Sequence, residues 1–126
     1  MSESERVAAS VLVVDDDEHI VAILSDVLSD EGYRVIAARD GAEAIAVVRR
    51  DRPDVILLDL MMPNVSGWSF LDMYRRTPPP HAPVIVVSAI PQAALKLSKE
   101  DVQGIVRKPF SVDRLLEVVA ATAHQG

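Results

Sequence analysis

Four sets of polar residues in this chain could together handle a phosphoryl group. Each set lies at the end of a short apolar run of the kind that forms a buried β-strand. In an open parallel α/β sheet, ligands bind outside the carboxyl ends of the strands, so these side chains would gather at one edge. The sets are a run of carboxylates, a single carboxylate, a hydroxyl and an ammonium: Asp15 with Asp16 and Asp17, then Asp59, Ser88 and Lys108.

The chemistry of these side chains indicates a magnesium-dependent phosphoryl site. Carboxylates brought together repel and raise one another's pKa unless a cation lies between them. Mg²⁺ is commonly held by one or two carboxylates and keeps waters that a phosphate can replace, so Asp15, Asp16, Asp59 and a backbone carbonyl would suit it. Asp59 is the candidate nucleophile, because a carboxylate can accept phosphate as a mixed anhydride. Lys108 and Ser88 would bind phosphoryl oxygens, the first as a point charge.

Each of these residues also has a purely structural interpretation. An Asp after a strand is often a turn former or a helix N-cap, a Ser there is commonly structural, and a Lys before Pro usually lies on the surface. The combination carries the argument, because four such accidents would have to fall on one edge of one sheet.

The elements that must position these residues alternate between strand and helix. Continuous apolar runs in the first, third and fourth strands indicate burial on both faces, hence a parallel sheet covered by helices. Right-handed crossovers then favour an α/β, flavodoxin-like, doubly wound sheet of order 2-1-3-4-5, flanked by five helices. The expected strands are residues 11–14, 33–38, 55–58, 84–88 and 104–107.

The expected helices follow these strands in turn. The first is indicated by apolar spacing from Ile20 to Leu28, with Gly32 beyond its end, and the second by the capping pair Asp40 and Glu43. A helix carrying residues 68–74 follows the third strand, and a short one within 92–98 follows the fourth. Ser111 can cap the last helix.

The composition is that of one soluble domain of 126 residues, with 49% hydrophobic and 25% charged residues. The formal charge of −6 argues against direct nucleic-acid binding. There is no Cys, and no apolar stretch is long enough for a bilayer-spanning helix. The first ten residues lack the apolar centre of a secretory signal. We therefore expect a flexible segment at residues 1–10, a domain at 11–124 and a cytoplasmic location.

Taken together, the motifs resemble those of the response regulator receiver domain, the CheY-like phospho-acceptor half of two-component signalling. The likeness runs from about Val11 to the last helix. The motifs that carry it are Val-Val-Asp15-Asp16-Asp17-Glu18, Pro53-Asp-Val-Ile-Leu-Leu-Asp59-Leu-Met-Met-Pro63-Asn-Val-Ser-Gly67, Val-Ile-Val-Val-Ser88-Ala89 and Lys108-Pro109-Phe110.

The resemblance implies a role for each matching residue. Asp15 and Asp16 are the acidic pair, Asp59 is the phosphoryl acceptor, and Met61 lends its backbone carbonyl to Mg²⁺, which Mn²⁺ can replace. Ser88 is the switch hydroxyl, Lys108 is the conserved-type lysine of the family, and the Lys108–Pro109 peptide bond is cis.

The resemblance also implies partners and an output. A sensor histidine kinase or a phosphotransfer protein supplies the phosphate, and the domain catalyses only its own phosphorylation and slow dephosphorylation. Phosphorylation shifts a two-state equilibrium toward a surface around the fourth helix, fifth strand and fifth helix. A downstream protein reads that surface, with no nucleic-acid contact and no membrane insertion, and the domain is expected to be a monomer or weak dimer.

Three departures from the family pattern have consequences. The position of the switch aromatic is Ile105, so a swinging ring is not the readout. The stretch between Ser88 and Lys108 is about two residues shorter than is usual in the family, so its helix is expected to be short or irregular. Met61 and Ile90, two residues after the acceptor and the switch hydroxyl, cannot orient a water, so we predict slow self-dephosphorylation.

Two other functions stay open from the sequence. A phosphorylation-independent binding module with a vestigial site is suggested by Ile105. A haloacid-dehalogenase-type phosphohydrolase also uses an Asp nucleophile, but it wants a second Asp at the position of Met61. The start at Met1 favours a stand-alone or N-terminal receiver over an internal piece of a longer regulator.

Overall fold

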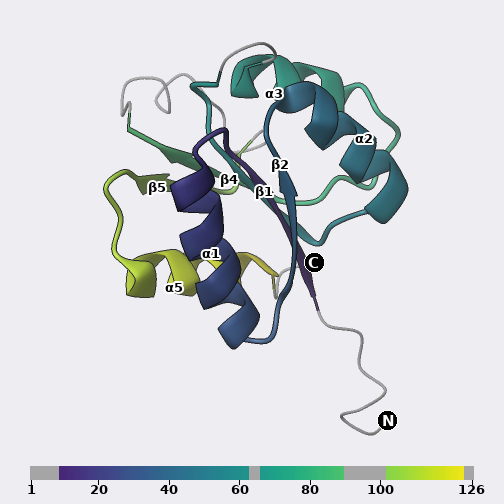
Figure 1. Ribbon diagram of the computed structural model, residues 1–126. Helices are drawn as coiled ribbons and strands as arrows, with labels where there is room; N and C mark the ends of the chain where they lie inside the picture. The colour runs from purple at the N-terminus through teal and green to yellow at the C-terminus, as the bar shows by residue number, and fades with distance from the viewer. Residues whose placement is uncertain (1–8, 63–65, 90–101, 124–126) are drawn as a thin grey trace, which may run out of the picture.

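The computed structural model describes residues 9–62, 66–89 and 102–123, and these contain a parallel five-stranded sheet of order β2-β1-β3-β4-β5 (Figure 1). All four neighbouring pairs of strands are parallel. The fold class and strand order predicted from the sequence are therefore confirmed. The strands are β1 (Ser10–Val14), β2 (Arg34–Ala38), β3 (Val55–Leu58), β4 (Val84–Ser88) and β5 (Gly104–Arg107).

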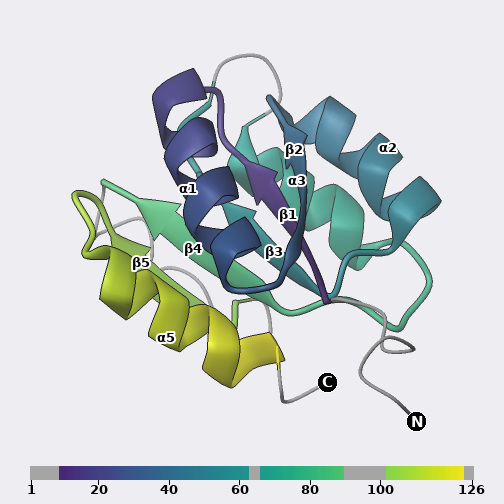
Figure 2. The ribbon, with the colours of Figure 1, turned by 60° about the horizontal axis from the view of Figure 1, so that its bottom comes forward.

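Helices cover both faces of the sheet (Figures 1 and 2). On one face lie α1 (Glu18–Asp30) and α5 (Val112–Ala123), and on the other α2 (Gly41–Asp51) and α3 (Gly67–Arg75). The helix expected within residues 92–98 falls outside the described residues. Within those residues, no helix is both long and apolar enough to cross a membrane.

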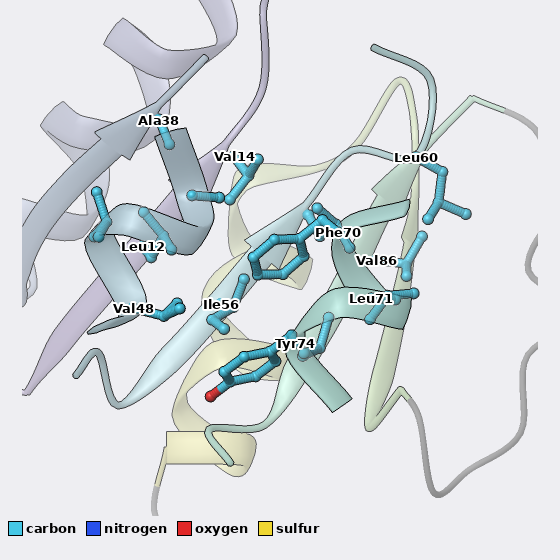
Figure 3. Packing of buried hydrophobic residues seen from close by; sticks show 14 of the residues in the cluster. Leu12, Val14, Ala38, Val48, Ile56, Leu60, Phe70, Leu71, Tyr74 and Val86 are labelled. Carbon is cyan, nitrogen blue, oxygen red and sulfur yellow. The ribbon is translucent and has the colours of Figure 1, made fainter. Parts of the chain in front are cut away.

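The strands read as continuous apolar runs because alternate residues enter two separate cores. Leu12, Ile56 and Val86 face α2 and α3, and pack around Phe70, which is fully buried (Figure 3). Their chain neighbours face α1 and α5, and pack against Leu115 and other buried residues there. Successive side chains on a strand point to opposite faces, so a strand covered on both sides must be apolar throughout.

The helix ends are formed by the residues that the sequence suggested. Asp40 Oδ1 accepts the N–H of Glu43 at 2.9 Å, and Ser111 Oγ accepts the N–H of Arg114 at 3.2 Å. At the end of α1, Gly32 has φ +93°, and its N–H donates to the Ser29 carbonyl. A glycine in this conformation closes a helix at little cost, because it has no Cβ to clash.

One difference from the expected strand limits is at Tyr33, which was predicted to begin the second strand. Its N–H donates instead to the carbonyl of Leu28, so Tyr33 completes the closing turn of α1 and the strand begins at Arg34. The first strand begins one residue earlier than expected, at Ser10, and the third, fourth and fifth have the predicted limits. The proline-rich connection at residues 77–83 is irregular, with a cis bond between Pro79 and Pro80.

Candidate functional site

The register of the central strands brings the first acidic residues together. Val14 of β1 lies opposite Leu58 of β3, so the residues that follow them, Asp15 and Asp59, leave the sheet side by side. The Asp59 N–H donates to the Val14 carbonyl at 2.9 Å, which extends the pairing by one step. Oxygen atoms of Asp15, Asp16 and Asp59 all lie within 4.8 Å of one another.

Lys108 reaches this cluster from the end of β5. Its Nζ lies 2.8 Å from Asp15 Oδ2 and 3.5 Å from Asp59 Oδ2, so one ammonium bridges two carboxylates. The Lys108 N–H donates to the Ser88 carbonyl at 2.9 Å, which fixes the start of the side chain beside β4. The peptide bond from Lys108 to Pro109 is cis, as the resemblance implied.

A backbone amide holds the other oxygen of each bridged carboxylate. Asp15 Oδ1 accepts the N–H of Asp17 at 2.9 Å, and Asp59 Oδ1 accepts the N–H of Met61 at 3.1 Å. Both carboxyl groups are buried, and each is oriented by one amide and one ammonium. The two groups are thus positioned before any ligand arrives.

The electrostatics of the site reflect its burial. Burial raises the pKa of Asp59, the Met61 amide and Lys108 only partly oppose this, and the Asp15 carboxylate adds to the rise. Burial by itself lowers the pKa of Lys108, but its bond to Asp15 and the attraction of both carboxylates outweigh that effect, so the pKa is raised. Lys108 therefore stays charged. Its single positive charge only partly offsets the negative charge of the three carboxylates.

The remaining predicted residues occupy different parts of this edge. Ser88 is buried at the end of β4, the strand next to β3, while Asp16 is exposed at the rim. Met61 follows Asp59 closely, and its residue surface is 56% exposed. Ile90 lies outside the described residues. The site thus brings Asp15, Asp16, Asp59 and Lys108 together, with Ser88 placed beside them through its backbone.

Sequence reasoning missed the role of Gly67 at this site. A Cβ built on Gly67 would lie 2.6 Å from Leu60 Cα and closer still to the Asp59 carbonyl oxygen. The start of α3 therefore touches the backbone that carries the acceptor, and only glycine fits there. Gly67 stood in the quoted motif, but a close backbone approach leaves no signal in composition or periodicity.

Asp17 also has a clearer role than the sequence indicated. Its Oδ1 accepts the N–H groups of His19 and Ile20, so it is the N-cap of α1, while its own N–H holds Asp15. One residue thus links the first helix to the acidic pair.

The donor set at this edge fits a divalent cation bound by oxygen atoms. Three carboxylates lie within reach of one another, and the only lysine or arginine paired with them among the described residues is Lys108. Oxygen ligands at an open, partly exposed position suit Mg²⁺, which retains part of its water shell.

This geometry agrees with what comparison with known proteins finds. The profile described as "Response regulator receiver domain" matches residues 11–120. The chain belongs to this family. It is therefore a CheY-like receiver of two-component signalling rather than a haloacid-dehalogenase-type phosphohydrolase.

Two curated relatives illustrate the range of proteins that carry such a receiver. The chain is 35% identical over 120 residues to the polar-differentiation response regulator DivK of Brucella anthropi, covering 87% of this chain and 92% of DivK. It is also 35% identical over 118 residues to the probable transcriptional regulatory protein TcrX of Mycobacterium tuberculosis, covering 92% of this chain. The chain spans 50% of the length of TcrX.

Solved structures support the fold assignment. The chemotaxis response regulator CheY4 of Vibrio cholerae has a TM-score of 0.82 and 30% identity, covering 92% of this chain and 99% of that one. The receiver domain of the Francisella response regulator 1452 also has a TM-score of 0.82 and 30% identity, covering 93% and 98%. Receivers of this family bind Mg²⁺ at an acidic pocket, interact with histidine kinases and downstream targets, and generally act as signalling domains rather than enzymes.

Proposed function

We propose that Asp59 of this receiver accepts a phosphoryl group from the phosphohistidine of a sensor histidine kinase or a phosphotransfer protein. The observation that carries the proposal is the Lys108 ammonium between Oδ2 of Asp15 and Oδ2 of Asp59, within a cluster of three carboxylates. A carboxylate that is buried, oriented and next to a cation is suited to attack phosphorus.

Asp15, Asp16, Asp59 and the backbone carbonyl of Met61 would hold Mg²⁺, with Mn²⁺ as a substitute. When bound, the ion supplies positive charge that offsets the oxygens of the phosphoryl group during transfer. The spacing of the three carboxylates supports this assignment, because their oxygens already lie within 4.8 Å of one another.

The transfer makes one bond and breaks one. An oxygen of Asp59 forms a bond to phosphorus as the bond from phosphorus to the donor imidazole nitrogen breaks, and the electron pair of that bond stays on the nitrogen. Lys108 binds a phosphoryl oxygen and so moves from its pairing with two carboxylates to a new anion. The Ser88 hydroxyl donates a hydrogen bond to another phosphoryl oxygen. The domain catalyses its own phosphorylation and has no separate substrate.

The readout of phosphorylation is a change in a protein-binding surface, which an unidentified downstream protein reads. Aspartyl phosphate adds negative charge and acceptor oxygens beside Ser88 and Lys108, and this biases a two-state equilibrium. Ile105, 45% exposed on β5, replaces the aromatic residue that would otherwise report the state. We place this activity in the cytoplasm, in a receiver spanning residues 11–124 with a flexible segment at 1–10 and a monomeric or weakly dimeric state.

The experiment that tests the proposal is intact mass spectrometry after incubation with acetyl phosphate and Mg²⁺. Wild type should gain one phosphate, and the gain should be absent with a chelator and absent in Asp59→Asn. Failure of wild type to gain mass under these conditions would point instead to a phosphorylation-independent binding module, for which the exposed Ile105 is the supporting feature.

The exposed side chain of Met61 supports the prediction that the aspartyl phosphate at Asp59 is hydrolysed slowly. A thioether beside the acceptor cannot orient a water for attack as an amide or carboxylate can. Met61→Asn should therefore shorten the lifetime of the aspartyl phosphate, whereas Met73→Asn, a matched change at an exposed position on α3, should leave it unchanged. Equal decay in wild type and Met61→Asn would contradict this role.

A further inference from the structure

A concave surface lies at the opposite edge of the sheet from Asp59. It is a groove of about 570 Å³ between the end of α2 and the proline-rich connection from α3 to β4. Asp54 and Pro83, which directly precede β3 and β4, are among its lining residues, so it opens at the amino ends of these strands. A volume in this range is typical of small-molecule binding sites.

Hydrogen bonds within the connection hold the groove in shape. Tyr74 Oη accepts the N–H of Ala82 at 2.6 Å, and His81 Nε2 donates to the Thr77 carbonyl at 2.8 Å. The Tyr74 and His81 rings lie 4.9 Å apart between centroids. Figure 3 shows the Tyr74 hydroxyl directed away from the buried Ile56 and Phe70. The phenol thus ends at the groove, and its O–H donates to no other residue in the described part of the chain.

The walls of the groove are largely apolar. They include three consecutive prolines at residues 78–80 and the side chain of Val48 on α2. Proline rings are rigid, so a ligand that packs on them gains contact without ordering flexible side chains.

Two arginines bring positive charge to this apolar groove. Arg49 and Arg52 both line it and both are exposed, and neither forms an ion pair with any other residue that the structure describes. Their neighbour Arg50 is paired with Asp51 at 2.8 Å. The one carboxylate lining the groove, Asp54, directs Oδ2 to the backbone N–H of Ser10 at 2.7 Å. The groove therefore carries positive charge on a protein whose net charge is −6.

The backbone at Arg52 points to a role for its side chain. Arg52 ends α2 with φ +47°, in the left-handed region that glycine and asparagine adopt more readily. An L-residue is disfavoured in this conformation, because its Cβ crowds the following carbonyl oxygen. Helix ends gain from nearby cations, which accounts for Arg49 in the last turn of α2. Arg49 already provides this gain, so it does not explain an arginine at position 52, where the backbone disfavours an L-residue.

We propose that this groove binds a small organic anion, a carboxylate or phosphate carried on an aromatic or aliphatic body. The guanidinium groups of Arg49 and Arg52 pair with the anionic head, the Tyr74 hydroxyl donates to it, and the body packs on the prolines. Arginine suits this task because its planar donor fork matches carboxylate and phosphate oxygens. The site is independent of the phosphoryl site, since it shares no residue with it.

Binding of 2-naphthoate, followed by amide chemical shifts in ¹H–¹⁵N NMR spectra, tests this proposal. The neutral isostere 2-naphthalenemethanol tests the need for charge, and inorganic phosphate tests the need for an apolar body. Wild type should bind naphthoate saturably, with the largest shifts at the amides of Thr77 and Ala82. Both comparison compounds should bind at least about 10-fold more weakly, the loss expected when a charge-assisted contact or an apolar contact is missing.

Variants locate the charge that the ligand recognises. Arg49→Gln with Arg52→Asn removes both guanidinium groups, and asparagine tolerates the left-handed backbone at position 52. Arg50→Gln is the matched control, because Arg50 is exposed and paired outside the groove. The double variant should lose at least about 10-fold in naphthoate affinity and the control should retain it. Equal binding by the double variant, equal binding of the neutral isostere, or no saturable shift at Ala82 would each overturn the proposal.

Discussion

The two edges of one sheet in this receiver carry opposite charge. At the carboxyl edge, three carboxylates gather around a single ammonium, from Lys108. At the amino edge, the guanidinium groups of Arg49 and Arg52 border an apolar groove whose one carboxylate is engaged by Ser10. The first edge is short of cations and the second is short of anions. Each is therefore prepared for a ligand of the charge that it lacks.

The edges also differ in how they are built. At the carboxyl edge, polar residues follow directly from buried strands, so strand register sets their positions. At the amino edge, the groove is formed by the end of a helix and a connection with no regular structure. The first arrangement tolerates little change in the backbone, whereas the second depends on a few hydrogen bonds, such as the one from Ala82 to Tyr74.

The largest loss of stability is expected from Gly67→Ala at the carboxyl edge. The new Cβ would collide with backbone atoms of Asp59 and Leu60, which cannot rotate away. We expect a loss of about 2–3 kcal/mol, or roughly 10 °C in Tm. Gly104→Ala is the control, because its Cβ meets the Val118 side chain at 3.0 Å and a side chain can shift. Thermal melts with equal losses at the two glycines would contradict the account.

Removing the ammonium should have the next largest effect. Lys108→Ala leaves Asp15 and Asp59 buried without their shared cation, and we expect a loss on the order of 2 kcal/mol, since Lys108 is partly exposed. Millimolar Mg²⁺ should restore more stability to this variant than to wild type, because the ion supplies the missing charge. Arg50→Ala, which breaks an exposed pair, should leave the stability almost unchanged. A Tm of Lys108→Ala that does not respond to Mg²⁺ would argue against a cation site here.

Asp59→Asn should act in the opposite direction and stabilise the metal-free protein. Burial raises the pKa of Asp59, so the folded state binds this proton more tightly than the unfolded state does. That contribution favours the fold at low pH and is lost as the pH rises through the raised pKa. Asp59→Asn should therefore raise the free energy of unfolding near pH 7 by on the order of 1 kcal/mol, seen as a higher Tm, and this gain should vanish below the ordinary pKa of about 3.9. Melts in the presence of a chelator at both pH values check the sign, and a loss of stability at pH 7 would refute it.

The smallest effect is expected at the amino edge, from Tyr74→Phe. The change removes the acceptor for the Ala82 N–H while keeping the ring that stacks on Phe70, at 5.5 Å between centroids. A loss of about 1 kcal/mol is typical for one such bond. Hydrogen exchange should quicken at Ala82 and remain unchanged at Asp59, whose N–H bonds within the sheet. Faster exchange at both amides would mean that the two edges are not independent.

The sequence predicted the carboxyl edge well because its signals are local. The apolar runs fixed the strand limits to within about one residue, and their order placed Asp15 beside Asp59, as the structure has them. The preference of Lys108 for Asp15 over Asp59 could not be predicted, since it depends on side-chain reach across the sheet. The same holds for Gly67. A glycine is required there because the backbone of Asp59 and Leu60, earlier in the chain, lies against it in the fold.

The amino edge was not predicted from the sequence at all. A groove between a helix end and a loop leaves no periodic pattern, so neither residues 77–83 nor the arginines at the end of α2 indicate it in the sequence. Tyr74 was predicted to lie on a helix, but its bond to Ala82 depends on how the prolines turn the chain. In a fold of this kind, sites formed by strand ends are therefore easier to predict from the sequence than sites formed by loops.

The most direct test of the central claim is to find which carboxylate carries the phosphate. After incubation with acetyl phosphate and Mg²⁺, borohydride reduces an aspartyl phosphate to homoserine, and peptide mass spectrometry then locates the changed residue. We expect homoserine at position 59, with none at position 15 or 16. Homoserine at either of those two positions, or none anywhere in a protein that has gained a phosphate, would contradict it.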